Sequence, residues 1–153
     1  MSPDAPTAAE IADLLARWWY RYDEGRTDEL AHLLTEDATF RVRTDTGTTD
    51  YEQFVRADFR GPEEICFWQA KHRGSSPYPL RHMVTNVGVE ATDGAAADFV
   101  SYLYVTQVVD GRPAPVPGGV VTGTVRRTDD GLRMSAFELV LDTQDSVPLK
   151  ERP

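Results

Sequence analysis

The stretch LRHMVTNVGVEATDGAAADFVSYLYVTQVV, residues 80–109, decides the fold class of this chain. Apolar and polar residues alternate along both of its halves, which is the pattern of half-buried β-strands. Between the halves, Asp93-Gly94 is a strong signal for a two-residue hairpin turn. The sequence therefore predicts a long antiparallel hairpin in which Leu80–Ala91 pairs with Ala96–Val109.

The turn also predicts the register of this hairpin. If Thr92 lies opposite Ala95, then His82 lies opposite Val105, and one face of the hairpin is apolar but is interrupted by polar side chains. That face carries Leu80, His82, Val84, Phe99, Leu103, Val105, Gln107 and Val109, together with a cross-strand pair of Ser101 and Asn86. Buried polar groups need hydrogen-bond partners, so an ordinary core face is not expected to gather this many of them. The face is therefore predicted to line a ligand cavity.

Helical patterns precede the hairpin, and further strands follow it. Thr7 and Glu10 form a capping-box pattern at the start of a helix that runs to about Glu24. The other predicted elements are a short helix at 27–34, a strand at 36–43, helical structure across 50–72, strands at 119–128 and 132–142, and a loop or bulged edge at GRPAPVPGG, residues 111–119. Helices first and strands later indicate an α+β fold with an antiparallel sheet covered on one face.

The whole chain, residues 1–153, is predicted to be one domain with frayed ends at about 1–6 and 144–153. A net charge of −9 without any basic cluster excludes a nucleic-acid partner. The sequence has no apolar run long enough to span a bilayer and no export-signal pattern, so no membrane partner is expected. The single cysteine, Cys66, excludes an internal disulfide and indicates a reducing, cytoplasmic location.

A candidate catalytic group lies at the end of the first predicted helix. Tyr22 continues the apolar stripe of this helix, and Asp23 borders the stripe about 100° further round. The best sheet face for this stripe is the one that carries His82, so the three polar side chains are predicted to converge. A carboxylate that accepts the proton of one imidazole nitrogen fixes the tautomer and makes the other nitrogen a general base. With a tyrosine hydroxyl as donor to a developing oxyanion, the set suits proton abstraction next to a carbonyl group.

Three segments carry a resemblance to a known family: YDEGRTDELAHLLTEDATF at 22–40, LRHMVTNVGVE at 80–90 and GGVVTGTVRRTDDGLR at 118–133. They resemble the nuclear transport factor 2-like (NTF2-like) superfamily, and within it the SnoaL-like, polyketide-cyclase-like and scytalone-dehydratase-like enzymes. The resemblance implies a cystatin-like α+β cone, in which a strongly curved antiparallel sheet wraps around N-terminal helices and leaves a pocket at its open end. It also implies a homodimer or a homotrimer.

The resemblance extends to the candidate catalytic residues. Tyr22 and Asp23 match a helix-borne tyrosine and aspartate of scytalone dehydratase, and His82 matches its strand histidine. A hexachlorocyclohexane dehydrochlorinase has an aspartate–histidine dyad that also matches Asp23 and His82. The second active-site histidine of scytalone dehydratase falls on Gln107, and its second active-site tyrosine falls near Val42. The resemblance therefore implies the reaction type, whereas scytalone itself is not the expected substrate.

The predicted function is a cofactor-independent lyase or isomerase that performs a dehydratase-like elimination on a small, apolar, oxygenated, polyketide-like molecule of secondary metabolism. Two alternatives stay open: a cyclase or epoxide-opening enzyme with the same dyad, and a non-catalytic small-molecule-binding or dimerisation module. No metal or cofactor is expected, because the sequence has no ligand-spaced histidine–acid cluster and no nucleotide motif. The predicted substrate-binding residues are Trp18, Phe40, Val42, Trp68, Phe99, Leu103, Val105 and Gln107.

Several other side chains have weaker signals. His32 and His72 are expected on the surface, the second of them at a helix end where a cation is favoured. Phe67 is expected in the core or in the pocket wall. Arg126 is expected at an exposed strand end, although a relative has an arginine near there in its pocket. Glu138 faces either solvent or the cavity.

Overall fold

A curved six-stranded sheet forms the frame of the fold in the computed structural model, which describes residues 4–153. The strands are β1 (Leu34–Thr44), β2 (Ala57–Arg60), β3 (Leu80–Asp93), β4 (Ala96–Val109), β5 (Arg112–Thr128) and β6 (Gly131–Leu141), in the order β2-β1-β6-β5-β4-β3. The helices are α1 (Ala8–Asp23), α2 (Asp50–Val55) and α3 (Pro62–Gly74), with short 3-10 helices at Thr27–Leu33 and Leu149–Glu151. The predicted α+β class is confirmed. Part of the predicted frayed N-terminal end, residues 1–3, lies outside the described residues.

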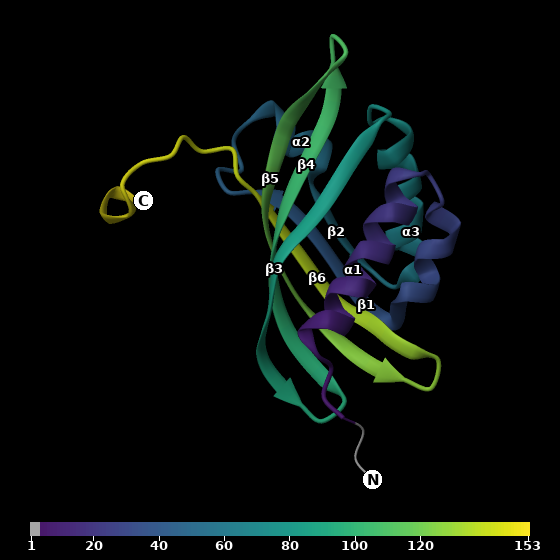
Figure 1. Ribbon diagram of the computed structural model, residues 1–153. Coiled ribbons are helices and arrows are strands. Elements are labelled where there is room, and N and C mark those ends of the chain that lie inside the picture. Colours follow the sequence, from purple (N-terminus) through teal and green to yellow (C-terminus); the bar gives the residue numbers. More distant parts are fainter. Residues whose placement is uncertain (1–3) are drawn as a thin grey trace.

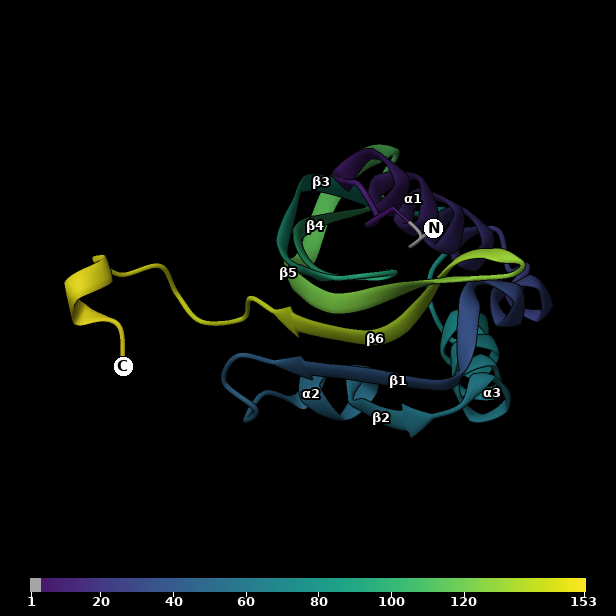
Figure 2. The ribbon, with the colours of Figure 1, turned by 90° about the horizontal axis from the view of Figure 1, so that it is seen from below.

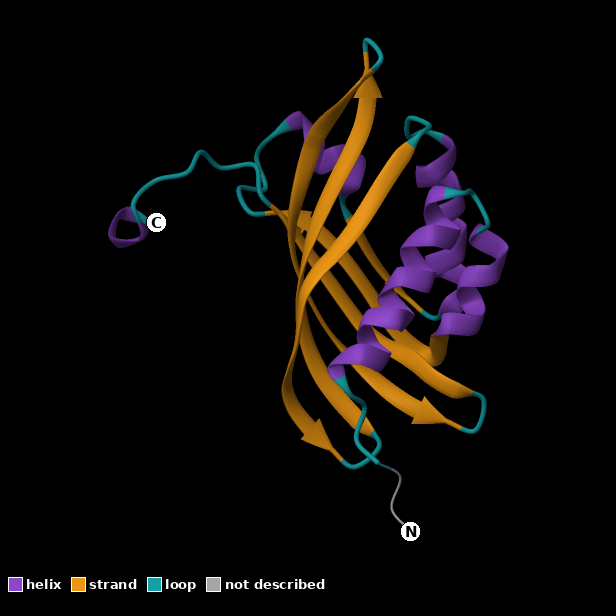
Figure 3. Ribbon diagram, viewed as in Figure 1, coloured by secondary structure: helices purple, strands orange, loops and turns teal. Residues whose placement is uncertain are grey.

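The helices α1 and α3 lie on the concave side of the sheet (Figures 1 and 3). In the end-on view the long strands β3, β4 and β5 curl around α1, and the C-terminal segment after β6 projects away from the sheet (Figure 2). Neighbouring strands are antiparallel except β1 and β6, which are parallel. The expectation of a wholly antiparallel sheet is therefore wrong at this pair. No hairpin joins β1 to β6, so their connection does not impose antiparallel pairing.

The helix α1 begins where the capping box predicts. Thr7 Oγ1 accepts the Glu10 backbone N–H at 3.3 Å, and the Glu10 carboxylate accepts the Thr7 backbone N–H at 2.9 Å. Gly25, with a φ of 72°, follows the helix end, where a left-handed residue lets the chain turn. The buried face of α1 consists of Ile11, Leu14, Leu15, Trp18, Trp19, Tyr22 and Asp23. This apolar face, which packs on the sheet, thus ends in an acid.

The predicted hairpin is present, but its turn is shifted by one residue. Asp93 pairs with Ala96, so the two central turn residues are Gly94 and Ala95 rather than Asp93 and Gly94. Gly94 has a φ of 55°, and a glycine with positive φ at the first central position is characteristic of a type II′ hairpin turn. The predicted pairing of Thr92 with Ala95 is therefore wrong.

Two irregularities in β3 restore the predicted register farther along the hairpin. They lie between Thr85 and Gly88 and between Val89 and Ala91, and beyond them His82 pairs with Val105 as predicted. Asn86 lies within the first irregularity with a φ of 56° and is exposed. It therefore does not form the predicted cross-strand pair. Bulges of this kind increase the bend and twist of a strand, which a sheet that wraps around a helix requires.

The region expected to be helical across 50–72 is interrupted by the short strand β2, which pairs with β1. The segment GRPAPVPGG, expected as a loop or a bulged edge, is mostly part of β5, and the pairing of β5 with β4 is irregular between Val116 and Gly119, so the second alternative is confirmed. Its prolines are tolerated because β6 pairs with β5 only from Gly119 onward, so one side of β5 is a free edge there and needs no ladder N–H.

Candidate active site

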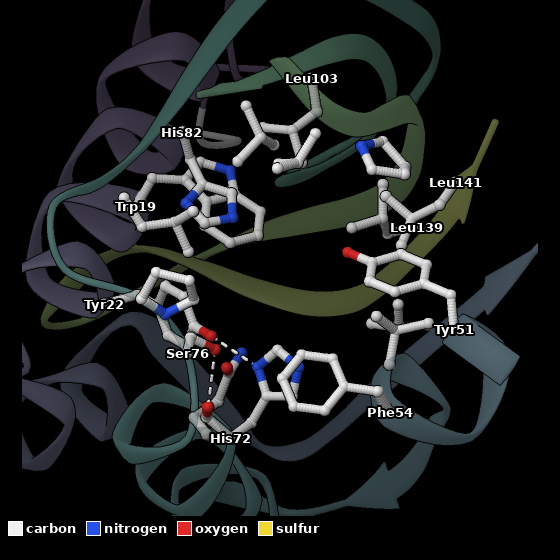
Figure 4. Close-up of a pocket in the computed structure, with 18 of the residues that line it drawn as sticks. Trp19, Tyr22, Tyr51, Phe54, His72, Ser76, His82, Leu103, Leu139 and Leu141 are labelled. Atoms are coloured by element: carbon white, nitrogen blue, oxygen red, sulfur yellow. Dashed lines mark hydrogen bonds between the residues drawn. The ribbon is translucent and has the colours of Figure 1, made fainter. Parts of the chain in front are cut away.

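A cavity of about 260 Å³ lies between the concave face of the sheet, the end of α1 and the helices α2 and α3 (Figure 4). Six of the eight predicted substrate-binding residues line this cavity: Phe40, Val42, Trp68, Leu103, Val105 and Gln107. Two other predicted residues, Trp18 and Phe99, lie in the core and do not line it. Trp18 packs against the ring of Phe137, and its neighbour Trp19, one step round the helix, lines the cavity instead.

Asp23 and His82 are in direct contact, as the sequence predicts. Oδ1 of Asp23 lies 2.6 Å from Nδ1 of His82, and Oδ2 accepts the His82 backbone N–H at 2.9 Å. Asp23 is only 4% exposed and does not line the cavity, whereas His82 does. An ionised carboxylate can only accept hydrogen bonds, so Nδ1 is the donor in this contact. In the neutral imidazole this leaves the lone pair on Nε2.

The last turn of α1 is held in place by Arg73 of α3. Its Nε and Nη2 donate to the backbone carbonyl of Asp23 at 3.0 and 2.8 Å, and Nη1 donates to the carbonyls of Ser76 and Pro77. The carbonyl end of a helix carries partial negative charge and lacks intrahelical partners, so a guanidinium is favourable there. It also offsets the unfavourable position of a carboxylate at that end. Trp19 stacks on the His82 ring at 4.3 Å with an interplanar angle of 4°, so the imidazole is held from two sides.

Tyr22 makes a second contact between α1 and a histidine. Its hydroxyl oxygen lies 2.6 Å from Nδ1 of His72, which belongs to α3. The expectation that His72 lies on the surface is wrong. Its Nε2 is buried, and Trp68 stacks on its ring at 4.5 Å. Phe54 packs against the ring at 4.6 Å (Figure 4). The polar end of the cavity thus contains two imidazoles rather than one.

The inward face of α3 holds the residues that the sequence analysis missed. Ile65, Trp68, Gln69 and His72 follow the i, i+3, i+4, i+7 spacing of one helix face, and this pattern could have placed Gln69 and His72 inside. Gln69 is 2% exposed and lines the cavity. Phe67 lies off this face and is 74% exposed, so its predicted place in the core or wall is wrong. Other unpredicted polar or aromatic lining residues are Tyr51, Phe54 and Ser76.

Burial changes the proton affinity of both partners in the second contact. Burial, together with the charges of His82 and Arg73, lowers the pKa of His72 to about 4. Burial raises the pKa of Tyr22 to about 12. Near neutral pH His72 is therefore uncharged and Tyr22 keeps its proton. The hydroxyl can then donate to Nδ1 of His72.

The structure also places the residues whose position was open. Glu138 lies beside Arg41 in a polar surface groove and does not line the cavity. Arg126 is exposed and pairs with Asp37 at 3.5 Å, so it does not line the cavity either. His32 is exposed, as predicted.

Within residues 4–153, no helix has the length and apolar character needed to cross a membrane. No group of three or more histidine, cysteine, aspartate or glutamate side chains in that range is arranged to hold a metal ion. Cys66 is a free thiol of intermediate exposure.

Solved structures with the same fold come from several bacteria. An NTF2-like protein with a cystatin-like fold from Novosphingobium aromaticivorans is 24% identical, with 90% of this chain and 82% of that chain covered and a TM-score of 0.71. The β subunit of the benzoate 1,2-dioxygenase of Burkholderia mallei is 16% identical, with 99% of both chains covered and a TM-score of 0.69. A candidate scytalone dehydratase from Novosphingobium aromaticivorans is 15% identical, with 94% and 93% covered and a TM-score of 0.67.

The cystatin-like cone implied by the resemblance is confirmed by these likenesses, which at such identities concern the fold alone. A search of curated proteins found no match. A family model described as the SnoaL-like domain matches residues 4–138, which includes the end of α1, the whole of α3 and the strand that bears His82. The chain therefore belongs to the SnoaL-like domain family.

Proposed function

We propose that the protein is a cofactor-independent lyase or isomerase that removes a proton next to a carbonyl group in a small, largely apolar, oxygenated substrate of the polyketide type. His82 is the general base, and Asp23 orients it. The observation that carries the proposal is the two-point contact of one buried carboxylate with the ring nitrogen and the backbone N–H of His82. This contact fixes both the tautomer and the direction of the imidazole, as a general base requires.

In the proposed reaction, Nε2 of His82 takes the proton from the carbon beside the carbonyl group, and the C–H electron pair forms an enolate. In an elimination, these electrons then form the C=C bond while a β-hydroxyl leaves, and the proton on His82 passes to the leaving oxygen to give water. Tyr22 and Gln107 are the predicted donors to the oxygen that gains charge or leaves. Gln107 lines the cavity and can donate directly, whereas the Tyr22 hydroxyl is joined to His72 and acts on that oxygen through His72.

The cavity supports a small, uncharged substrate. Its volume of about 260 Å³ is near the lower end of ligand pockets. Aromatic and aliphatic side chains such as Phe40, Trp68 and Leu139 form most of its wall. No lysine, arginine, aspartate or glutamate occurs among its lining residues in the described chain, so a charged substrate would have no counter-charge there.

A cyclase or epoxide-opening enzyme would use the same dyad to deprotonate a hydroxyl group or a water molecule. The mass of the product separates these reactions, because only dehydration loses water. The likeness to a dioxygenase β subunit over 99% of both chains favours a further candidate, a binding or assembly module without chemistry of its own. In that case neither the wild type nor His82→Ala would turn over a substrate. The expected homodimer or homotrimer stays a prediction that analytical ultracentrifugation would test.

The test is turnover of bicyclic β-hydroxy ketones such as 4-hydroxy-2-tetralone, whose dehydration gives fluorescent 2-naphthol. His82→Ala should lower the rate by about 10²- to 10⁴-fold, because the general base is lost. His32→Ala, which changes an exposed histidine, is the matched control and should keep full activity. A chelator should have no effect. Full activity of His82→Ala, or inhibition by the chelator, would contradict the proposal.

A further inference from the structure

Three buried side-chain nitrogens of cavity-lining residues have no hydrogen-bond partner in the described chain: Nε1 of Trp19, Nε2 of Gln69 and Nε2 of His72. Gln69 and His72 belong to α3 and are three positions apart, so they lie on the same face of that helix. An unsatisfied buried donor is costly in a folded protein. Two of them side by side on a cavity wall indicate that a ligand supplies the acceptor.

The contact with Tyr22 allows His72 to be a donor toward the cavity. A neutral Tyr22 hydroxyl can donate to Nδ1 of His72 across 2.6 Å, and in that tautomer the ring carries its own proton on Nε2. Trp68 and Phe54 pack against the ring and hold its plane. The amide of Gln69 supplies a second N–H group one helical turn away. The pair therefore suits an oxygen atom, which can accept two hydrogen bonds.

The charge of the wall decides which kind of oxygen fits. The lining residues in the described chain include no lysine or arginine, and Arg73 is engaged with backbone carbonyls of the loop and of α1. A carboxylate would be buried there without a counter-charge, which is far less favourable than burial of a neutral carbonyl group. Two neutral N–H donors are sufficient partners for a ketone, ester or lactone oxygen.

We propose that Gln69 and His72 form a subsite that holds a neutral carbonyl oxygen of the substrate. The subsite lies on the α3 side of the cavity, and Tyr22 contacts the rings of both His72 and His82 (Figure 4). The subsite rests on the proposed function only in that His82 is the base. It restricts the substrate class to neutral carbonyl compounds. Gln69 and His72 then hold the oxygen that becomes the enolate, and Tyr22 acts on that oxygen through His72.

The test measures binding without turnover. The probes are 2-tetralone, which has a neutral ketone, tetralin, which has the same rings without oxygen, and tetralin-2-carboxylate, which has an anion. Tryptophan fluorescence reports binding, because Trp19 and Trp68 line the cavity. The wild-type protein should bind the ketone about tenfold more tightly than the hydrocarbon and more tightly than the carboxylate. Gln69→Leu and His72→Phe should each lower this ketone preference about two- to twelvefold.

Matched controls make the same chemical changes at exposed sites. Gln53→Leu and His32→Phe should keep the ketone preference of the wild type. Gln69→Leu should also keep the stability of the ligand-free protein, because Nε2 has no partner in the fold. If that variant does not fold, Gln69→Met repeats the test with a side chain of similar length and no donor, and His72→Phe is independent of both.

Three results would overturn the subsite. Equal affinities for the ketone and the hydrocarbon in the wild type would mean that the two nitrogens bind only water. A carboxylate that binds as tightly as the ketone would contradict the argument from charge. Loss of the ketone preference in His82→Ala, with Gln69→Leu unchanged, would place the oxygen at the dyad. Because no turnover is measured, a failure of the catalytic proposal leaves this test intact, and the reverse also holds.

Discussion

Replacement of Asp23 by asparagine tests whether this residue sets the proton position on His82. The carboxylate accepts two hydrogen bonds, from Nδ1 at 2.6 Å and from the backbone N–H at 2.9 Å. An amide has only one accepting atom. If that oxygen keeps the backbone N–H, the NH₂ group faces Nδ1 and selects the tautomer with the proton on Nε2. If the amide turns round, its NH₂ group opposes the backbone N–H, and that hydrogen bond is lost.

The first arrangement removes the lone pair that the proposed reaction needs. Asp23→Asn should therefore lower turnover by about 10²- to 10⁴-fold, which corresponds to about 3–5 kcal/mol in the activation free energy. The fold should persist, because asparagine has nearly the same shape, with a loss of about 1–3 kcal/mol in the free energy of unfolding from the weakened contact. Asp28→Asn, at an exposed position near the end of α1, is the matched control and should change neither quantity.

Nuclear magnetic resonance can test the tautomer without any substrate. The chain has three histidines, so long-range ¹⁵N spectra of the imidazoles can be assigned with single substitutions. In the wild type at neutral pH, His82 should carry its proton on Nδ1, and in Asp23→Asn it should carry it on Nε2. A wild-type His82 with its proton on Nε2 would refute the reasoning, and so would a variant whose tautomer and turnover are both unchanged.

Three further predictions concern the contacts around the dyad. Tyr22→Phe should lower turnover only about two- to twelvefold, because it removes one neutral hydrogen bond, and a loss as large as that of His82→Ala would contradict this role. Burial lowers the pKa of His72 from 6.5 to about 4, so this residue should reduce stability as the pH falls from 6.5 toward 4, and urea denaturation of His72→Phe should show a smaller fall over that range. Arg73→Met should lower the free energy of unfolding by about 2–4 kcal/mol, because it leaves buried carbonyls without donors, whereas the exposed control Arg60→Met should change it by less than about 0.5 kcal/mol.

Local signals predicted the elements that bring the dyad together. The capping box at Thr7 and Glu10 sets the start of α1, and helical spacing from there places Asp23 at the edge of the buried stripe. Alternation along 80–109 predicts the strand that carries His82. These signals are short in range and strong, so α1, β3 and the contact between Asp23 and His82 followed from them.

The register of the hairpin shows why the rest did not follow. The pairing of His82 with Val105 was predicted from a turn that is shifted by one residue, and two bulges in β3 cancel the error. The bulges accompany the curvature of the sheet around α1, which is a tertiary requirement that alternation along the sequence does not encode. The correct pairing at His82 is therefore partly fortuitous. A register predicted from one turn is safest within a few residues of it.

His72 was misplaced because two local rules compete at the end of α3. A basic residue in the last turn of a helix is favoured by the helix dipole, and this rule predicts a solvated cation. Membership of the face formed by Ile65, Trp68 and Gln69 predicts burial instead. Burial prevails here, because the Tyr22 hydroxyl partners Nδ1 and Trp68 covers the ring. The partner comes from another helix, so only tertiary structure decides between the two rules.

One helix end assigns opposite roles to the two histidines of the proposed site. Tyr22 and Asp23 are consecutive, so their side chains leave α1 about 100° apart and reach different imidazoles. The carboxylate accepts from Nδ1 of His82, which leaves a lone pair on Nε2 for a substrate proton. In the proposed subsite the hydroxyl donates to Nδ1 of His72, which leaves a proton on Nε2 for a substrate oxygen. A proton acceptor and a proton donor thus arise from the same residue type, and the difference lies in which side chain of α1 each Nδ1 meets.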